Sequence, residues 1–152
     1  MKKQVNITIK TESVPLNDSP RHISTVTKGN VFYKDELLYI LYKENPEEFG
    51  KTQTTVKIKN DRLELIRTGD ITSRLIFSKN ILYEGSYNTP YGSLPLKIEV
   101  SNLEIDADEN FGNIFMRYNL DLAGDKTDNK FTLKYTSVNW KDKWQWTILS
   151  QK

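Results

Sequence analysis

The chain has 152 residues, of which 37% are hydrophobic, and its 22 basic and 20 acidic side chains give a formal net charge of +2. This length is typical of one domain that buries roughly 70% of its unfolded surface. The absence of cysteine excludes disulfides, thiolate nucleophiles and Cys-ligated metals, and a single histidine excludes a His-based metal triad. We therefore expect no bound metal and no cofactor.

The charge and hydropathy patterns exclude several kinds of partner. Basic and acidic side chains are interspersed, which is typical of a solvated surface and not of a nucleic-acid interface. Residues 5–10, after the basic start, alternate between apolar and polar, so they do not form the apolar core of a signal peptide. No run approaches the ~18 apolar residues of a transmembrane helix. We predict a cytoplasmic protein with no nucleic-acid or membrane partner, and leave a homodimer open.

The first half of the chain shows the period-two alternation of half-buried strands. Strands are expected at residues 5–10, 22–33, 37–43, 54–59 and 62–67. Turn-forming residues separate them at 15–20, 35–36, 44–51 and 60–61, where we expect loops. Gly29 interrupts the second strand, and this predicts a bulge or a sharp bend.

The second half continues the same pattern. Strands are expected at residues 71–78, 83–87, 94–105, 114–122 and 131–135. Pro90 stands at the second position of the turn 89–92, as turns of types I and II prefer. Within residues 94–105 the apolar side chains change parity near Ser101 and Asn102, which predicts a bulge in that strand.

About ten short strands in sequence, without a convincing amphipathic helix, predict an all-β fold: a single antiparallel up-and-down β-barrel. Closing the sheet removes its edges, and a β-sandwich is the alternative. We assign residues 1–136 to the barrel. Residues 137–152 differ in composition, with three tryptophans among lysines, and are expected to pack on the barrel as a C-terminal extension.

Arg67 is the first candidate ligand-binding residue. It shares the parity of Leu63 and Leu65, so its guanidinium is expected to face the barrel interior near a strand end. It can hold an anion there with two parallel hydrogen bonds. The alternative is an ion pair with a carboxylate such as Asp70 that closes the barrel mouth. Arg74, on the parity of Ile76, joins Arg67 only if its strand twists.

Tyrosines are the other candidates, because each has an apolar ring and a hydrogen-bonding tip. Tyr87 and Tyr91 are expected near the barrel mouth. Catalytic motifs are absent from the sequence. Residues 106–117 do not have glycine and glutamate at the two positions where a calcium loop requires them, and no nucleophile elbow, phosphate loop or zinc motif occurs. We predict no catalytic residues, and an enzyme is the least favoured class.

Three segments have the order and spacing of a known family: residues 54–58, 66–69 and 87–96. The best marker is Tyr87-Asn88-Thr89-Pro90-Tyr91-Gly92, followed by Pro95. Over about residues 3–136 the chain resembles the YwiB-like family, a bacterial domain of unknown function with a calycin-like (lipocalin-like) β-barrel. The resemblance implies the same barrel and, by analogy with other barrels of this kind, a small molecule in the lumen. It implies no catalytic residue, and residues 137–152 extend beyond it.

Together these observations predict a non-enzymatic protein that binds a small amphipathic or anionic ligand inside the barrel. The candidate ligand-binding residues are Arg67, Arg74, Tyr87 and Tyr91. The alternative is a structural or protein-interaction module whose barrel interior is filled by side chains. A cavity of roughly 300 Å3 or more favours binding or catalysis, and a packed interior favours the structural alternative.

Overall fold

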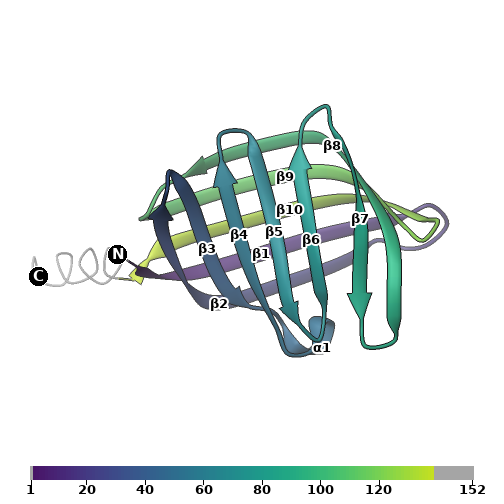
Figure 1. The fold of residues 1–152 in the computed structure, drawn as a ribbon, viewed down its shortest axis with the longest axis horizontal. Coiled ribbons are helices and arrows are strands. Elements are labelled where there is room, and N and C mark those ends of the chain that lie inside the picture. Colours follow the sequence, from purple (N-terminus) through teal and green to yellow (C-terminus); the bar gives the residue numbers. More distant parts are fainter. Residues whose placement is uncertain (1, 139–152) are drawn as a thin grey trace, which may run out of the picture.

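The computed structural model describes residues 2–138, and these form a closed barrel of ten antiparallel strands (Figure 1). The elements are β1 (Lys3–Pro15), β2 (Arg21–Lys34), β3 (Leu37–Lys43), α1 (Pro46–Phe49), β4 (Thr52–Lys59), β5 (Arg62–Gly69), β6 (Thr72–Ser78), β7 (Leu82–Thr89), β8 (Gly92–Ala107), β9 (Phe111–Leu122) and β10 (Asp125–Ser137). Each strand pairs with its neighbours in the chain, and β10 pairs with β1. The predicted up-and-down barrel is confirmed. The tryptophans of the predicted C-terminal extension lie outside the described residues.

The strands form because one face of each is core and the other is surface. In β3, for example, Leu38, Ile40 and Tyr42 are buried, while the residues between them are only partly covered. Asp35 and Glu36 adopt φ values of 53° and 67°, the conformation of a tight hairpin turn, between β2 and β3. The predicted strand and turn positions in this region are therefore confirmed.

The bulge predicted in β8 is also confirmed. The register of β8 against β9 shifts between Val100 and Asn102. The extra residue returns Leu103 to the core after the parity change, and Leu103 is buried opposite Met116.

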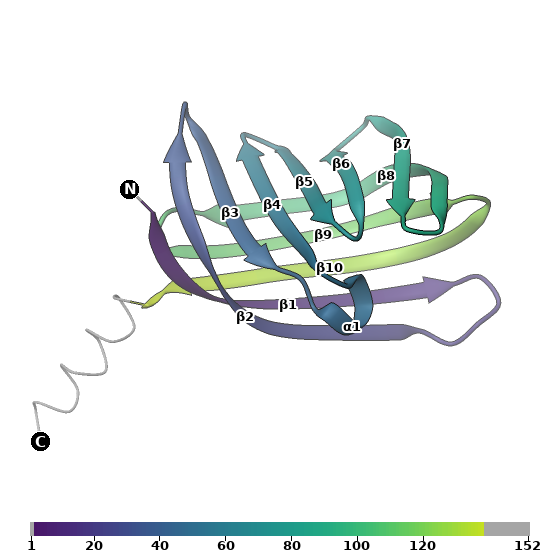
Figure 2. The same cartoon turned by 60° about the horizontal axis from the view of Figure 1, so that its bottom comes forward.

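Gly29 lies where β2 begins to pair with β3 while it still pairs with β1. The register of β2 against β1 continues through Gly29 without a shift, so of the two predicted alternatives, a bulge or a sharp bend, the bulge is absent. Figure 2 shows that β2 curves along its length. A Cβ at this position would lie 2.2 Å from the carbonyl oxygen of Leu41 and 2.7 Å from Cδ1 of Ile7. The glycine permits a close approach of backbone to backbone.

The connection between β3 and β4, predicted as a loop, contains the one-turn helix α1. The side chain of Asn45 caps it by accepting a hydrogen bond from the backbone N–H of Glu47 at 3.0 Å, and Pro46 occupies the first turn. Gly50 ends the helix at a φ of 63°. Figure 2 places α1 beside the start of β4 and the end of β5, and Glu48 of α1 lies near Arg21 of β2.

The two ends of the barrel differ in packing. The end away from α1 is filled by side chains that are at most 1% exposed: Val5, Ile7, Val31, Ile40, Val56, Leu63, Ile114 and Leu133. None of these lines the cavity described below. The space inside the barrel is therefore confined to the end that carries α1.

Candidate functional site

A cavity of about 310 Å3 occupies the α1 end of the barrel. It forms where β2 separates from β3, because β2 pairs with β3 only from Gly29 onward. Its apolar lining includes Leu65, Leu75, Phe77, Ile98, Met116 and Phe131. At the mouth, Glu48 of α1 faces Arg21 of β2, with Oε2 and Nη2 4.0 Å apart. This volume is at the lower end of the range for small-molecule sites.

A row of polar side chains crosses the cavity end of strands β3 to β7. Register pairing places Tyr42 beside Thr54, Thr54 beside Arg67, Arg67 beside Ser73, and Ser73 beside Tyr87. Tyr42, Arg67 and Tyr87 line the cavity. The hydroxyl of Ser73 is buried and has no hydrogen-bond partner among the described residues. Strands β3 to β7 therefore carry a continuous row of polar side chains at this end of the barrel.

An ion pair between Arg67 and Glu44 lies at the centre of this polar row. Nε of Arg67 donates to Oε2 of Glu44 at 3.2 Å, and the hydroxyl of Thr54 donates to the same oxygen at 2.5 Å. The side chains of Arg67 and Glu44 are only 13% and 6% exposed. Cζ of Arg67 lies 4.6 Å from the ring centroid of Phe49, so α1 adds a cation–π contact.

The sequence placed Arg67 on the inside correctly, but the suggested partner Asp70 is wrong. Oδ2 of Asp70 accepts a hydrogen bond from the backbone N–H of Lys51 at 2.9 Å and thereby fastens the end of the α1 connection. The carboxylate that meets Arg67 is Glu44. Glu44 directly follows β3, and its backbone N–H still bonds to the carbonyl of Thr52 at 2.9 Å, so it continues the inward alternation of Tyr42.

Arg67 and Glu44 each keep hydrogen-bonding capacity toward the cavity. Within residues 2–138, Nε is the one guanidinium nitrogen of Arg67 with a hydrogen-bond partner, and Oε2 is the one bonded oxygen of Glu44. Both residues line the cavity. The pair thus presents unused donors and an unused acceptor at the same place.

Burial alters the tyrosines around this pair. Burial above all raises the pKa of Tyr87; the negative charge of Glu44 adds to the rise and the positive charge of Arg67 opposes it. Burial likewise raises the pKa of Tyr118, again against the effect of Arg67. The pKa of Tyr42 is raised chiefly by burial and further by Glu44, while Arg67 and a hydrogen bond with Thr54 act against the rise. All three phenols stay neutral in ordinary buffers.

These raised values predict a loss of stability at high pH. Below the ordinary tyrosine pKa of about 10, a phenol is protonated in both the folded and the unfolded state, so it does not make the free energy of unfolding depend on pH. As the pH rises above 10, the unfolded chain loses protons first, so the free energy of unfolding falls by up to about 1.4 kcal/mol per pH unit and tyrosine. Urea denaturation between pH 9 and pH 11 measures this slope, and Tyr118→Phe should reduce it. An unchanged slope in that variant would contradict the assignment of Tyr118.

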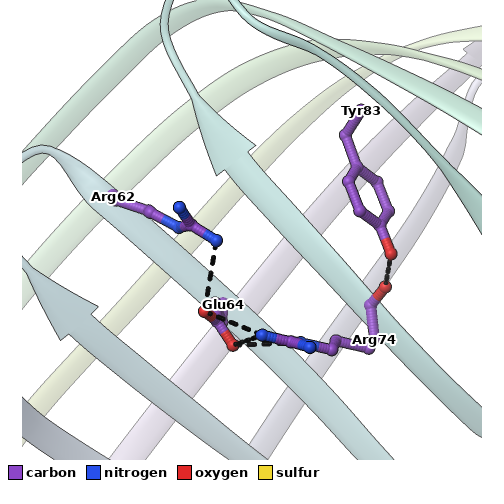
Figure 3. A network of polar contacts seen from close by, with 4 residues as sticks. All are labelled: Arg62, Glu64, Arg74 and Tyr83. Carbon is purple, nitrogen blue, oxygen red and sulfur yellow. Dashed lines mark hydrogen bonds and ion pairs between the residues drawn. The ribbon is translucent and has the colours of Figure 1, made fainter.

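The structure does not bring Arg74 to the cavity. Arg74 lies on the outer face of β6, where its guanidinium donates to both carboxylate oxygens of Glu64 at 3.2 and 3.3 Å. Arg62 contacts the same carboxylate, and Figure 3 shows the three side chains together. The twist that would turn Arg74 inward is absent, because Ser73 is the residue of β6 paired with Arg67.

Tyr91 also lies away from the cavity. It stands at the tip of the β7–β8 hairpin and is 99% exposed. Of the four predicted ligand-binding residues, the structure therefore brings together Arg67 and Tyr87. The tyrosine of the family marker that faces the interior is Tyr87, because Tyr87 pairs with Ser73 inside the barrel.

The described part of the chain gives no sign of a metal or a spanning helix. Residues 2–138 contain no cluster of three or more His, Asp and Glu side chains that could hold a metal ion. No helix among them has the length and apolar character needed to cross a membrane.

The geometry defines a class: an up-and-down antiparallel β-barrel, packed at one end and hollow at the other, with a buried ion pair in its cavity. Residues 7–133 match the family described as "Domain of unknown function (DUF1934)", and the chain belongs to that family. It is 26% identical over 137 residues to the uncharacterized beta-barrel protein YwiB of Bacillus subtilis (strain 168), a match that covers 90% of this chain and 95% of that protein. The crystal structure of ywiB protein from Bacillus subtilis superposes with a TM-score of 0.81 at 22% identity, over 90% of this chain and 92% of that one. The YwiB-like resemblance read from the sequence is confirmed.

Proposed function

We propose that this protein is a non-enzymatic binder of a small amphipathic molecule whose polar end carries a carboxylate or similar anion. The observation that carries the proposal is the position of Arg67, which lines the cavity and keeps its terminal nitrogens free of partners within residues 2–138. The anion would sit on Arg67, and the hydroxyl of Tyr87 is the neighbouring hydrogen-bonding group. The apolar part would contact the apolar side chains that line the rest of the cavity. A calycin-like role as a ligand carrier and a cytoplasmic location belong to this proposal.

The cavity supports this function over a filled structural barrel. A barrel that serves only as a scaffold can fill its lumen with side chains, as this one does at the end away from α1. At the α1 end, Phe77 and Phe131 instead border an open space. A largely buried ion pair such as Arg67–Glu44 often stabilises a fold no better than apolar residues of similar volume, which favours a role in recognition over a purely structural one.

The test compares two arginine variants. Binding of 4-methylpentanoate and of its neutral analogue 4-methylpentan-1-ol is followed by NMR titration at pH 7. We expect Arg67→Met to weaken binding of the carboxylate by about tenfold or more, because a charge-assisted bidentate contact is lost. Binding of the alcohol should change by less than about threefold.

Arg74→Met is the matched control, because it removes the same side chain from the outer face of the neighbouring strand. It should leave the affinity for both probes unchanged. Equal affinity of wild type and Arg67→Met for the carboxylate would overturn the proposal, as would a wild-type chain that binds neither this carboxylate nor the carboxylate-bearing amino acids tested below.

A further inference from the structure

We infer that the ligand of this cavity is a zwitterion of the amino-acid type: a carboxylate and an ammonium on the same or adjacent carbon atoms, attached to a short apolar group. The inference rests on the proposed function and adds Glu44 to it as the residue that selects the ammonium. Its basis is that the buried cation and the buried anion of the site face the same cavity.

The charges of Arg67 and Glu44 favour a zwitterion over a simple anion. Arg67 does not offer a free positive charge, because Glu44 already lies 3.2 Å from its Nε. A simple anion that binds the terminal nitrogens of Arg67 would be held close to the carboxylate of Glu44, in surroundings from which water is largely excluded. The repulsion offsets part of the gain. An ammonium on the same ligand removes this repulsion, because it can pair with Glu44.

The hydrogen-bonding groups that Glu44 and Arg67 leave unused match the two ends of a zwitterion. Oε2 of Glu44 already accepts from Thr54 and Arg67, whereas Oε1 accepts from no described residue. An ammonium has three donors and can use this oxygen. On the other side of the pair, the terminal nitrogens of Arg67 match a carboxylate. Each half of the zwitterion therefore finds a complementary group that the protein itself leaves unused.

The short distance between Arg67 and Glu44 limits how far apart the two charges of the ligand can be. Glu44 and Arg67 are in direct contact, so the groups that they bind must also be close together. This condition excludes long zwitterions whose charges are separated by many bonds, and it fits an α- or β-amino acid. The cavity of about 310 Å3 and its apolar lining of Leu65, Leu75 and Phe77 then leave room for an aliphatic or aromatic side chain.

The test uses matched ligands that differ by one charged group. L-leucine is compared with 4-methylpentanoate, which lacks the ammonium, and with 3-methylbutan-1-amine, which lacks the carboxylate. L-phenylalanine, 3-phenylpropanoate and 2-phenylethylamine form a second set. Each is titrated into the full wild-type chain at pH 7 by NMR. We expect one of the amino acids to bind about tenfold or more tightly than both of its analogues.

Glu44→Gln identifies the cause, because glutamine keeps the shape and an acceptor for Thr54 but removes the charge. In this variant the preference for the amino acid over the carboxylate should fall to about twofold or less, and the carboxylate should bind more tightly than to the wild type. The wild-type comparison does not depend on this variant, so poor folding of Glu44→Gln would leave the test intact.

The outcomes separate the two proposals. If the carboxylate binds wild type as tightly as the amino acid and depends on Arg67, the zwitterion inference is wrong and the proposed function stands. If neither amino acids nor carboxylates bind, both are wrong. If the amino acid is preferred equally by wild type and Glu44→Gln, the role assigned to Glu44 is wrong.

Discussion

Gly29→Ala should lower the free energy of unfolding by about 3 kcal/mol or more, although it adds a single methyl group. The new Cβ would lie 2.2 Å from the carbonyl oxygen of Leu41, which is a backbone atom of the neighbouring strand and cannot move by a change of rotamer. Relief requires β2 and β3 to separate where their pairing begins. Such a cost is a large fraction of the ~5–15 kcal/mol that stabilises an ordinary domain. Urea denaturation followed by circular dichroism measures it.

Gly85→Ala is the control for this prediction. Gly85 also lies in a strand, but its new Cβ would meet the far end of the Tyr83 ring, at 2.6 Å from the hydroxyl oxygen. This ring can shift at the expense of its hydrogen bond to the carbonyl of Arg74, so we expect a loss of about 1 kcal/mol. Equal stability losses in the two variants would show that the backbone contact at Gly29 has no special weight.

Leu133→Ala should destabilise the barrel by about 3–4 kcal/mol, and Leu96→Ala by about half as much. Leu133 is 0% exposed in the packed end, so its truncation creates a new void among rigid neighbours. Leu96 is 4% exposed but borders the existing cavity, and its side chain has fewer contacts to lose. Both substitutions remove the same atoms from a buried leucine, so the difference reports the packing of the two ends.

Chemical denaturation of both variants in the same buffer tests this difference. Exposed Leu94, in the same strand as Leu96, serves as a reference whose truncation should cost less than either. Equal losses for Leu133→Ala and Leu96→Ala would mean that the α1 end is as tightly packed as the other end, contrary to the cavity described here.

Most of the fold could be predicted because a closed barrel repeats one physical rule along the whole chain. Every strand has a core face and a surface face, and so produces the same alternation, as in Val5, Ile7 and Ile9. The bulge in β8 was visible for the same reason, since the extra residue changes the parity of the buried side chains. Helix α1 was missed because four residues are too few for periodicity. The cap formed by Asn45, Pro46 and Glu47 was its available signal.

The site was less predictable because it depends on register between strands. Parity places Arg67 inside, but nothing local shows that Glu44, which follows β3 two strands away from β5, contacts it. In β6 both faces of the strand carry apolar residues, so the sequence alone does not show whether the face of Arg74 or the face of Leu75 points into the barrel. The pairing of inward-facing Arg67 with Ser73 shows that Leu75 points inward and Arg74 outward. Tyr91 shows a further limit, because a tyrosine at a hairpin tip has no alternation to follow.

The pairing of the first strand with the last has a consequence for the newly made chain. Val5 completes its backbone pairing only when Ser137 is present, so β1 and β9 keep unpaired edges on the ribosome until β10 has been synthesised. During that interval the nascent sheet can recruit strands from other chains. Any ligand that needs a closed lumen can bind only after synthesis of the barrel has finished, so abundance of the ligand cannot guide its early folding.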